Sequence, residues 1–343
     1  MASFASDLKA PNPQLVWDTI NGYQRTAALR TAIELELFTA IGGGATVVPE
    51  LAKRCGASER GIRILCDYLT VIGLLTKVGG VYGLTPTSAV FLDQHSPAAM
   101  GSISRFLNSP KLMAGFANLT ETVRKGTTQL SDGGCIAPEY DMWPTFAESM
   151  TPIMRAATVF IANEVASDGA QPPCRVLDIA AGHGLFGIEV AKVFPQAEIV
   201  AQDWPKVLDV AKKNATAAGV SDRYHLLPGD AFTVDFGGGY DLVLLMNFLH
   251  HFDASTCVKL LEKIRAALSP KGRVITLEFV PDEDRVSPPI PASFSMMMLG
   301  LTPAGDAYTA SEHLEMAREA GFPEARLVAI PHSPQQLIIS TKT

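Results

Sequence analysis

The sequence has no long apolar run, no excess of positive charge and no paired cysteine motif, and each absence excludes a class of protein. No stretch of its 343 residues approaches the roughly 18 apolar residues of a membrane span, so we expect no membrane association. The formal net charge of −7 gives no general attraction to nucleic acid. The five cysteines form no CxxC and the N-terminus has no signal-peptide pattern, which indicates a reducing, cytoplasmic setting. We also expect no metal site.

What is present describes a folded protein with a large core. Hydrophobic residues make up 47% of the chain and charged residues 18%, which excludes a disordered chain. At roughly 150 residues per domain, the length indicates more than one domain. We expect a mainly α-helical, winged-helix-like domain over residues 1–95, a helical linker over residues 96–170 and an α/β domain over residues 171–343. The segment 167–174, rich in Gly and Pro, is the best boundary.

The first domain has the order helix, helix, hairpin. Residues 15–39 are expected to form two helices broken near Gly22 or Thr31, and residues 47–55 and 59–72 two more. The segments 74–77 and 81–84 fit two strands around a Gly-Gly turn. A winged helix can bind DNA, but Arg60 and Arg63 are flanked by acidic residues, so a regulator is the weaker hypothesis. The apolar helices of residues 14–40 favour dimerisation instead.

The last domain alternates short apolar strands with helices. We expect strands over residues 176–179, 198–201, 224–227, 242–246, 274–279, 326–330 and 336–340, and helices over residues 185–194, 206–218, 255–268 and 311–320. Such alternation predicts a Rossmann-like, mostly parallel sheet with helices on both faces and ligands at the carboxyl ends of its strands. The last two strands are close enough to form a hairpin. Residues 281–308 are expected to be a long irregular segment.

The stretch RVLDIAAGHGLFG, residues 175–187, is the best candidate for a ligand site. A strand carrying Asp178 opens into a small-residue turn at Ala180, Gly182 and Gly184, and a helix follows. Small residues let a ligand lie against the backbone, and we expect the first amides of the helix to be free to meet it. The turn therefore predicts a nucleotide-type site.

Two ligands compete for this site. The turn matches GxGxxG and Asp203 ends the next strand, as in dinucleotide sites, so an NAD-linked oxidoreductase is an alternative. However, Asp178, Asp203 and Asp230 follow or end three consecutive strands, and carboxylates gathered there repel a pyrophosphate. S-adenosylmethionine carries a sulfonium and an ammonium group and no phosphate. The charge pattern therefore favours this methyl donor.

The chain resembles the class I S-adenosylmethionine-dependent O-methyltransferases that have an N-terminal winged-helix dimerisation domain, among them plant phenol and bacterial polyketide enzymes. The resemblance runs from about Gln14 to Thr341 and depends on the segments VLDIAAGHG, QDWP and GDAF. It implies a sheet ending in an antiparallel strand, an intertwined homodimer and methyl transfer to a hydroxyl. It also implies a set of cofactor-binding residues: Asp178, Ala180, Gly182, Gly184, Asp203, Trp204, Asp230, Ala231, Phe232 and Asn247.

The resemblance assigns catalysis to the segment after the fourth strand of the sheet. His250 takes the position of the family's general base, and an imidazole is suited to accept a hydroxyl proton near neutral pH. Glu278 matches the glutamate that orients this histidine. His251 stands where the family often has Asp, and it stays open as the alternative base. The second glutamate of the plant pattern falls near Ala307, with Asp306 the nearest substitute, so a family member with another or a lost reaction is also an alternative.

Apolar and aromatic residues suggest the acceptor. Trp143, Phe146, Met150 and Met154 fall on one face of an expected helix, and Phe294, Met297 and Met298 follow the fifth strand. Together with His251, the residues Phe146, Met150, Phe294, Met297 and Met298 are our candidates for an apolar slot that binds a planar molecule. The predicted acceptor is a small aromatic hydroxyl compound.

Overall fold

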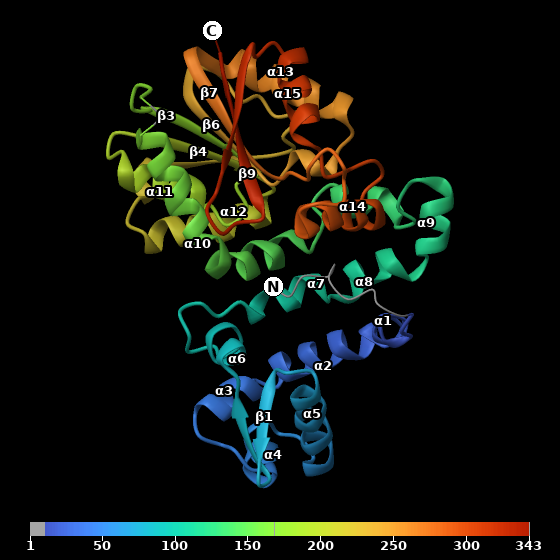
Figure 1. Cartoon of the computed structure of the whole chain (residues 1–343). Helices are drawn as coiled ribbons and strands as arrows, with labels where there is room; N and C mark the ends of the chain where they lie inside the picture. Colours follow the sequence, from blue (N-terminus) through green and yellow to red (C-terminus); the bar gives the residue numbers. More distant parts are fainter. Residues whose placement is uncertain (1–10, 168, 343) are drawn as a thin grey trace. The chain divides into compact units, whose positions relative to one another are not determined.

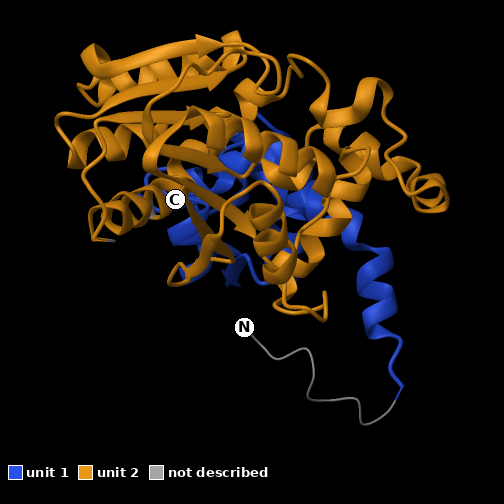
Figure 2. Cartoon of the chain, turned by 90° about the horizontal axis from the view of Figure 1, so that it is seen from above, with its two compact units in different colours: residues 1–108 blue, residues 109–343 orange. Residues whose placement is uncertain are grey.

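The computed structural model describes residues 11–167 and 169–342 and contains two compact units, residues 1–108 and 109–343 (Figure 2). The first ten residues of the expected 1–95 domain, and residue 168 in the expected boundary segment, lie outside the described residues. The helical segment 109–167 groups with the sheet rather than standing apart. The three-part division at residues 95 and 170 stays a prediction, because compact units are defined by contacts and not by independent folding.

The first unit contains the expected helix–helix–hairpin motif. Its elements are α1 (Gln14–Ile20), α2 (Gly22–Glu34), α3 (Leu37–Gly42), α4 (Val48–Arg54), α5 (Glu59–Val71), β1 (Leu75–Val78), β2 (Val81–Leu84), α6 (Pro86–Phe91), η1 (Gly101–Ile103) and α7 (Ser104–Leu107). Ser58 begins α5 by accepting a hydrogen bond from the Gly61 amide, as N-cap residues do. The break near Gly22 is confirmed. The alternative at Thr31 is wrong, because this residue lies inside α2 and the next break falls at Glu36, whose φ is +53°.

The second unit is built around a seven-stranded sheet (Figure 1). Its helices and strands are α8 (Pro110–Ala117), α9 (Leu119–Lys125), η2 (Ser131–Ile136), α10 (Trp143–Ser167), β3 (Arg175–Ile179), α11 (Leu185–Val193), β4 (Glu198–Asp203), α12 (Pro205–Ala217), η3 (Ser221–Arg223), β5 (Tyr224–Pro228), β6 (Tyr240–Met246), η4 (Leu249–His251), α13 (Ala254–Ala267), β7 (Leu268–Phe279), α14 (Pro289–Leu301), α15 (Ala310–Glu319), β8 (Glu324–Ala329) and β9 (Gln335–Thr341).

The strand order is β5-β4-β3-β6-β7-β9-β8, with β9 antiparallel to both of its neighbours and the strands from β5 to β7 parallel. The predicted mostly parallel sheet with an antiparallel last strand is confirmed. Because the chain moves outward from β3 to β5 and then returns to β6 on the other side of β3, the carboxyl end of β3 is the switch point where α/β sheets bind ligands.

Apolar side chains on both faces of the sheet bury it between helices. On one face α10, α11 and α12 pack through residues such as Ile161, Ile188 and Leu208. On the other face α13 and α15 pack through Leu260, Ile264 and Met316. No helix among the described residues combines the length and the apolar character needed to cross a membrane.

The expectation that residues 281–308 are irregular is wrong, because α14 occupies Pro289–Leu301. Pro288, Pro289 and Pro291 suggest an interrupted chain. However, they stand at the N-terminal end of the helix, where the missing amide of proline costs no intrahelical hydrogen bond. The rest of α14 is apolar on every side and therefore has no helical periodicity to detect.

Candidate functional site

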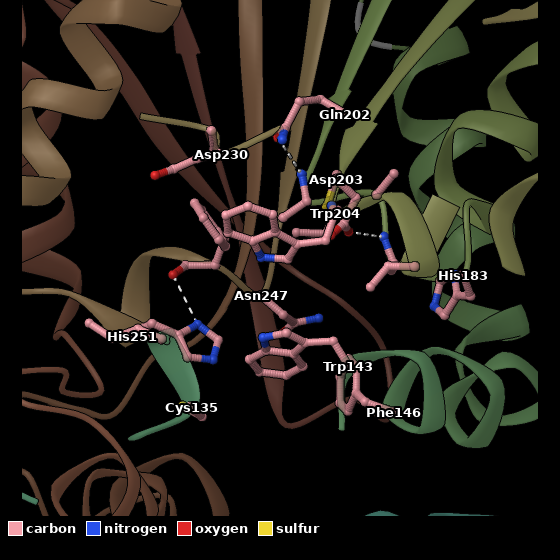
Figure 3. Close-up of a pocket in the computed structure, with 18 of the residues that line it drawn as sticks. Cys135, Trp143, Phe146, His183, Gln202, Asp203, Trp204, Asp230, Asn247 and His251 are labelled. Carbon is pink, nitrogen blue, oxygen red and sulfur yellow. Dashed lines mark hydrogen bonds between the residues drawn. The ribbon is translucent and has the colours of Figure 1, made fainter. Parts of the chain in front are cut away.

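A cavity of about 180 Å³ opens at the carboxyl ends of β3, β4, β5 and β6. Because one water molecule needs only about 10–15 Å³ of such volume, the cavity is large enough for a ligand. Figure 3 shows Gln202, Asp203 and Trp204 on one side of it and Cys135, Trp143 and Phe146 on the opposite side. The predicted site residues that line it are Ala180, Gly182, Asp203, Trp204, Asp230, Ala231, Phe232, Asn247, Phe146, Met150 and His251. The predicted residues that lie outside its lining are Asp178, Gly184, His250, Glu278, Phe294, Met297 and Met298.

The small-residue turn after β3 adopts left-handed backbone at Ala180, Gly182 and Gly184, with φ of +51°, +57° and +74°. A side chain on Gly184 would collide with Tyr224, because an added Cβ would lie 2.5 Å from its hydroxyl oxygen. Glycine at 184 thus lets β5 and α12 approach the turn. Ala180 adopts a conformation that alanine disfavours, at the start of the cavity wall.

Two of the first three amides of α11, those of Leu185 and Gly187, are not free, which corrects the sequence-based expectation. The Leu185 amide donates to Nδ1 of His183 at 3.1 Å, and the Gly187 amide donates to Oδ2 of Asp178 at 3.1 Å. The Gly182 amide in the turn donates to Oδ2 of Asp203 at 2.8 Å. A diphosphate would need these donors, so the turn is poorly suited to a dinucleotide.

Two carboxyl groups are buried beneath and beside this turn. Burial raises the pKa of Asp178 to about 8, although the Gly187 amide opposes the shift and the charge of Asp203 adds to it. Burial also raises the pKa of Asp203 to about 6, against hydrogen bonds from the Gly182 and Trp204 amides. Asp203 lines the cavity and Asp178 supports the turn from behind. Of the three carboxyl groups that the sequence predicts at this edge, Asp203 and Asp230 therefore line the cavity, and Asp178 lies outside its lining.

The side chain of Gln202 links the turn after β3 to the loop after β5 through two hydrogen bonds. Gln202, at the end of β4, accepts from the Ala180 amide at 3.3 Å and donates to the Gly229 carbonyl at 2.5 Å. Next to it, Asp230 accepts from the Phe232 amide at 2.8 Å, which fixes the loop that carries Ala231 and Phe232. Sequence reasoning missed Gln202, and only its place beside Asp203 at a strand end hinted at it.

His250 and Glu278 form a buried pair. Nδ1 of His250 lies 2.5 Å from Oε2 of Glu278, whose Oε1 accepts from the Phe248 and Leu249 amides at 3.0 and 2.8 Å. Burial alone would raise the pKa of Glu278, but its pairing with His250, together with His313 and the Leu249 amide, outweighs burial and holds the pKa below its ordinary value. A carboxylate only accepts hydrogen bonds, so Nδ1 of His250 carries the proton and Nε2 is the basic nitrogen.

His251 lies against His250 and faces the cavity. The two ring centroids are 4.2 Å apart, and Trp143 meets the His251 ring edge-on at 5.4 Å. Nδ1 of His251 donates to the Phe248 carbonyl at 3.1 Å, a bond drawn in Figure 3. Burial, together with the neighbouring His250, lowers the pKa of His251 well below its ordinary value. The ring is therefore neutral, with Nε2 as its acceptor.

The aromatic and methionine stripe of α10 forms one wall of the cavity, because Trp143, Phe146, Met150 and Met154 all line it. The loop before α10 contributes Cys135, Ile136, Ala137 and Pro138, which sequence reasoning missed because a Gly/Ser-rich connection gives no binding pattern.

Helix α14 supports the histidine pair instead of lining the cavity. Phe294 stacks on Phe279 at 4.2 Å and meets the His250 ring edge-on at 4.8 Å. Met298 is buried. Asp306, the suggested substitute for a second glutamate, accepts from Arg285 at 3.2 Å and does not line the cavity. No group of three His, Cys, Asp or Glu side chains placed to hold a metal ion occurs in the described part of the chain.

The fold and the site define an α/β protein that binds a nucleoside-type ligand without a diphosphate beside an apolar slot. Comparison with known proteins agrees. Residues 116–323 match an O-methyltransferase domain, and residues 17–94 match an O-methyltransferase dimerisation domain. The chain therefore belongs to the O-methyltransferase family.

Individual relatives cover nearly the whole chain. A 3-hydroxy-5-methyl-1-naphthoate 3-O-methyltransferase from Streptomyces sahachiroi is 30% identical over 92% of this chain and 91% of its own. A solved protein from Nostoc punctiforme, assigned as an O-methyltransferase, is 48% identical with a TM-score of 0.94, covering 97% of this chain and 100% of its own. PigF, solved with S-adenosylhomocysteine, is 25% identical with a TM-score of 0.83, over 97% of this chain and 100% of its own.

Proposed function

We propose that this protein transfers a methyl group from S-adenosylmethionine to a hydroxyl of a small aromatic molecule. The observation that carries the proposal is a single cavity with carboxyl groups at one end and an aromatic wall with an imidazole at the other. S-adenosylmethionine supplies an electrophilic methyl group bound to sulfur. The residues of the chain bind the two reactants side by side and accept the hydroxyl proton of the acceptor.

The donor end of the cavity fits a cationic nucleoside. Asp203 is proposed to accept both ribose hydroxyls, and Asp230 the adenine amino group. Trp204, Ala231, Phe232 and Asn247 complete this wall, with Ala180 and Gly182 beneath the amino-acid end. Asp178 and Gly184 act from behind by holding the turn. The occupied amides of the turn favour this ligand over NAD.

We assign His250 as the general base and Glu278 as the residue that orients it. The Glu278 carboxylate fixes the proton on Nδ1 and makes Nε2 the nitrogen that takes the hydroxyl proton. Such a base contributes typically ~10²–10⁴-fold to the rate, and alignment of the reactants supplies much of the rest. His251, Phe146 and Met150 are proposed to bind the acceptor, while Phe294 of α14 packs against the His250 ring from outside the lining.

Two measurements test this function. Calorimetric titration should show binding of S-adenosylmethionine or S-adenosylhomocysteine and none of NAD. A screen of phenols, catechols and hydroxyquinones by mass spectrometry should then detect a product heavier by one methylene group. Binding of NAD alone would instead support the oxidoreductase alternative.

The proposed working form is a homodimer joined through the N-terminal unit. Helix α1 has no buried residue, and its large apolar side chains are exposed on this chain: Leu15, Val16, Trp17 and Ile20. Exposed apolar surface of this kind marks an interface. All five cysteines are free, which fits the reducing cytoplasm that we propose as the location.

A further inference from the structure

The cavity lining contains no cationic side chain. Among the described residues that line it, neither lysine nor arginine occurs, and the ionisable groups are Asp203, Asp230, His183, His251 and Cys135. Two of these five are acids. An acceptor that brings a negative charge of its own would therefore meet no lysine or arginine on the walls.

The histidines and the cysteine of the lining do not supply that charge either. Nδ1 of His183 accepts from the Leu185 amide, so this nitrogen is unprotonated, and burial lowers the pKa of the ring to about 4. The His251 ring donates from Nδ1 to a carbonyl and is neutral, as argued above. Burial raises the pKa of the Cys135 thiol to about 12, so it stays protonated.

Three cationic side chains of the second unit already have partners of their own. Nζ of Lys263 donates to the Ala231 and Val234 carbonyls at 2.9 and 2.6 Å, behind the loop that carries Asp230. Lys111 is paired with Asp141, and Arg285 with Asp306 and Glu312. Turning any of them toward the slot would leave a carboxylate or a carbonyl without its partner.

We propose that the acceptor is an uncharged hydroxyarene, and that the slot rejects analogues carrying a carboxylate, sulfate or phosphate. This inference rests on the proposed function, because it identifies the substrate class of the same site. An anion in the slot would have to give up its water against the apolar wall of α10, with no cationic side chain to replace the lost solvation. A phenolic hydroxyl, in contrast, carries no charge, and its one proton can go to Nε2 of His250, the nitrogen proposed as the base.

Matched acid and ester pairs test the proposal. The probes are 6-hydroxy-2-naphthoate, 4-hydroxycinnamate and 4-hydroxybenzoate, each against its methyl ester, with 2-naphthol as the unsubstituted reference. Binding to the protein saturated with S-adenosylhomocysteine is measured by calorimetry at pH 7.5. We expect the best ester to bind at least about tenfold more tightly than its acid. An acid that binds as tightly as its ester, or the failure of every ester and of 2-naphthol to bind, would overturn the proposal.

A charge introduced into the wall gives the converse test. Met150→Lys should lower the ratio of ester affinity to acid affinity about tenfold, because the new charge favours the acid. The neutral control Met150→Gln should leave this ratio unchanged. If the buried Lys prevents folding, Ile136→Lys with Ile136→Gln repeats the comparison on the loop before α10. Equal ratios in the Lys and Gln variants would contradict the role of charge.

Binding readouts keep this inference separable from the proposed function. Failure of S-adenosylhomocysteine to bind refutes the methyl-transfer proposal before any acceptor is added, and removes the basis of the inference with it. If S-adenosylhomocysteine binds but no probe is methylated, the proposed reaction fails for these acceptors. The ratio of ester affinity to acid affinity still shows whether the slot rejects a negative charge.

Discussion

At the scale of single residues, two adjacent histidines have different environments. His250 points to Glu278 and the aromatic ring of Phe294, while His251 bonds the chain's own backbone and faces the cavity. The sequence could place both at the end of β6, because a strand end is readable from its apolar run. It could not separate them, because the partners that distinguish His250, Glu278 on β7 and Phe294 on α14, come near it only when the chain folds.

Replacing His250 by alanine tests the proposed base. Turnover should fall by about 10²-fold or more, the scale of general-base catalysis. Affinity for S-adenosylhomocysteine should stay within a few-fold, since His250 lies outside the cavity lining. His251→Ala serves as the comparison, and it should mainly weaken acceptor binding. An unchanged kcat in His250→Ala with a collapsed kcat in His251→Ala would move the base to His251.

Ala180 offers a test of backbone strain. Its φ of +51° is left-handed, a conformation that costs a non-glycine residue about 1–2 kcal/mol. Ala180→Gly should therefore raise the free energy of unfolding by about 1 kcal/mol, which is ~2–4 °C in Tm for a unit of this size. The reverse exchange, Gly182→Ala, should lower Tm by a similar amount. A fall in Tm for Ala180→Gly in thermal unfolding would show that the turn is not strained.

At the scale of elements, periodic segments were predictable and proline-rich ones were not. Most strands and helices around the sheet are predicted to within a few residues, because short apolar runs alternate with amphipathic helices, although β7 begins six residues earlier than expected, at Leu268. Helix α14 was missed since three prolines precede a segment that is apolar on every side. The occupied amides at the start of α11 were missed because their acceptors, Asp178 and His183, become partners only when the turn folds.

The N-cap of α13 holds the helix that follows the two histidines. Asp253 accepts from the Thr256 amide at 3.0 Å and from the Ser255 hydroxyl at 2.6 Å. Asp253→Ala should destabilise the protein by about 1 kcal/mol, the usual value of an N-cap. Chemical denaturation at pH 7 measures the loss. The control Asp253→Asn keeps a capping oxygen and should lose less.

The hydrogen bonds of Asp253 also predict that the stability of the protein depends on pH. The hydrogen bonds from Ser255 and Thr256 lower the pKa of Asp253 to about 2, below its unfolded value near 4. A depressed carboxyl pKa adds stability above pH 4 that is lost as the pH falls through 2. The stability difference between the protein and Asp253→Asn should therefore shrink between pH 4 and pH 2. A constant difference over that range would contradict the assignment.

At the scale of the whole molecule, the two units have different features. The second unit holds every residue that lines the cavity, so donor and acceptor ends are both built on one sheet and its helices. The first unit matches a dimerisation domain and leaves the apolar side chains of α1 exposed. The change between a helix–hairpin pattern and a strand–helix pattern indicates more than one domain in the sequence, but the predicted boundaries at residues 95 and 170 differ from the division between these units.

The exposed face of α1 leads to a prediction about assembly. Trp17 and Ile20 are each 59% exposed on this chain, and burying them against a second copy would remove that apolar surface from water. The double variant Trp17→Glu, Ile20→Glu should halve the mass measured by light scattering, because an interface cannot bury two unpaired carboxylates. Gln14→Glu, which adds one charge on the polar side of the same helix, should keep the dimer. If the double variant also keeps its mass, the subunits are joined through a surface other than α1.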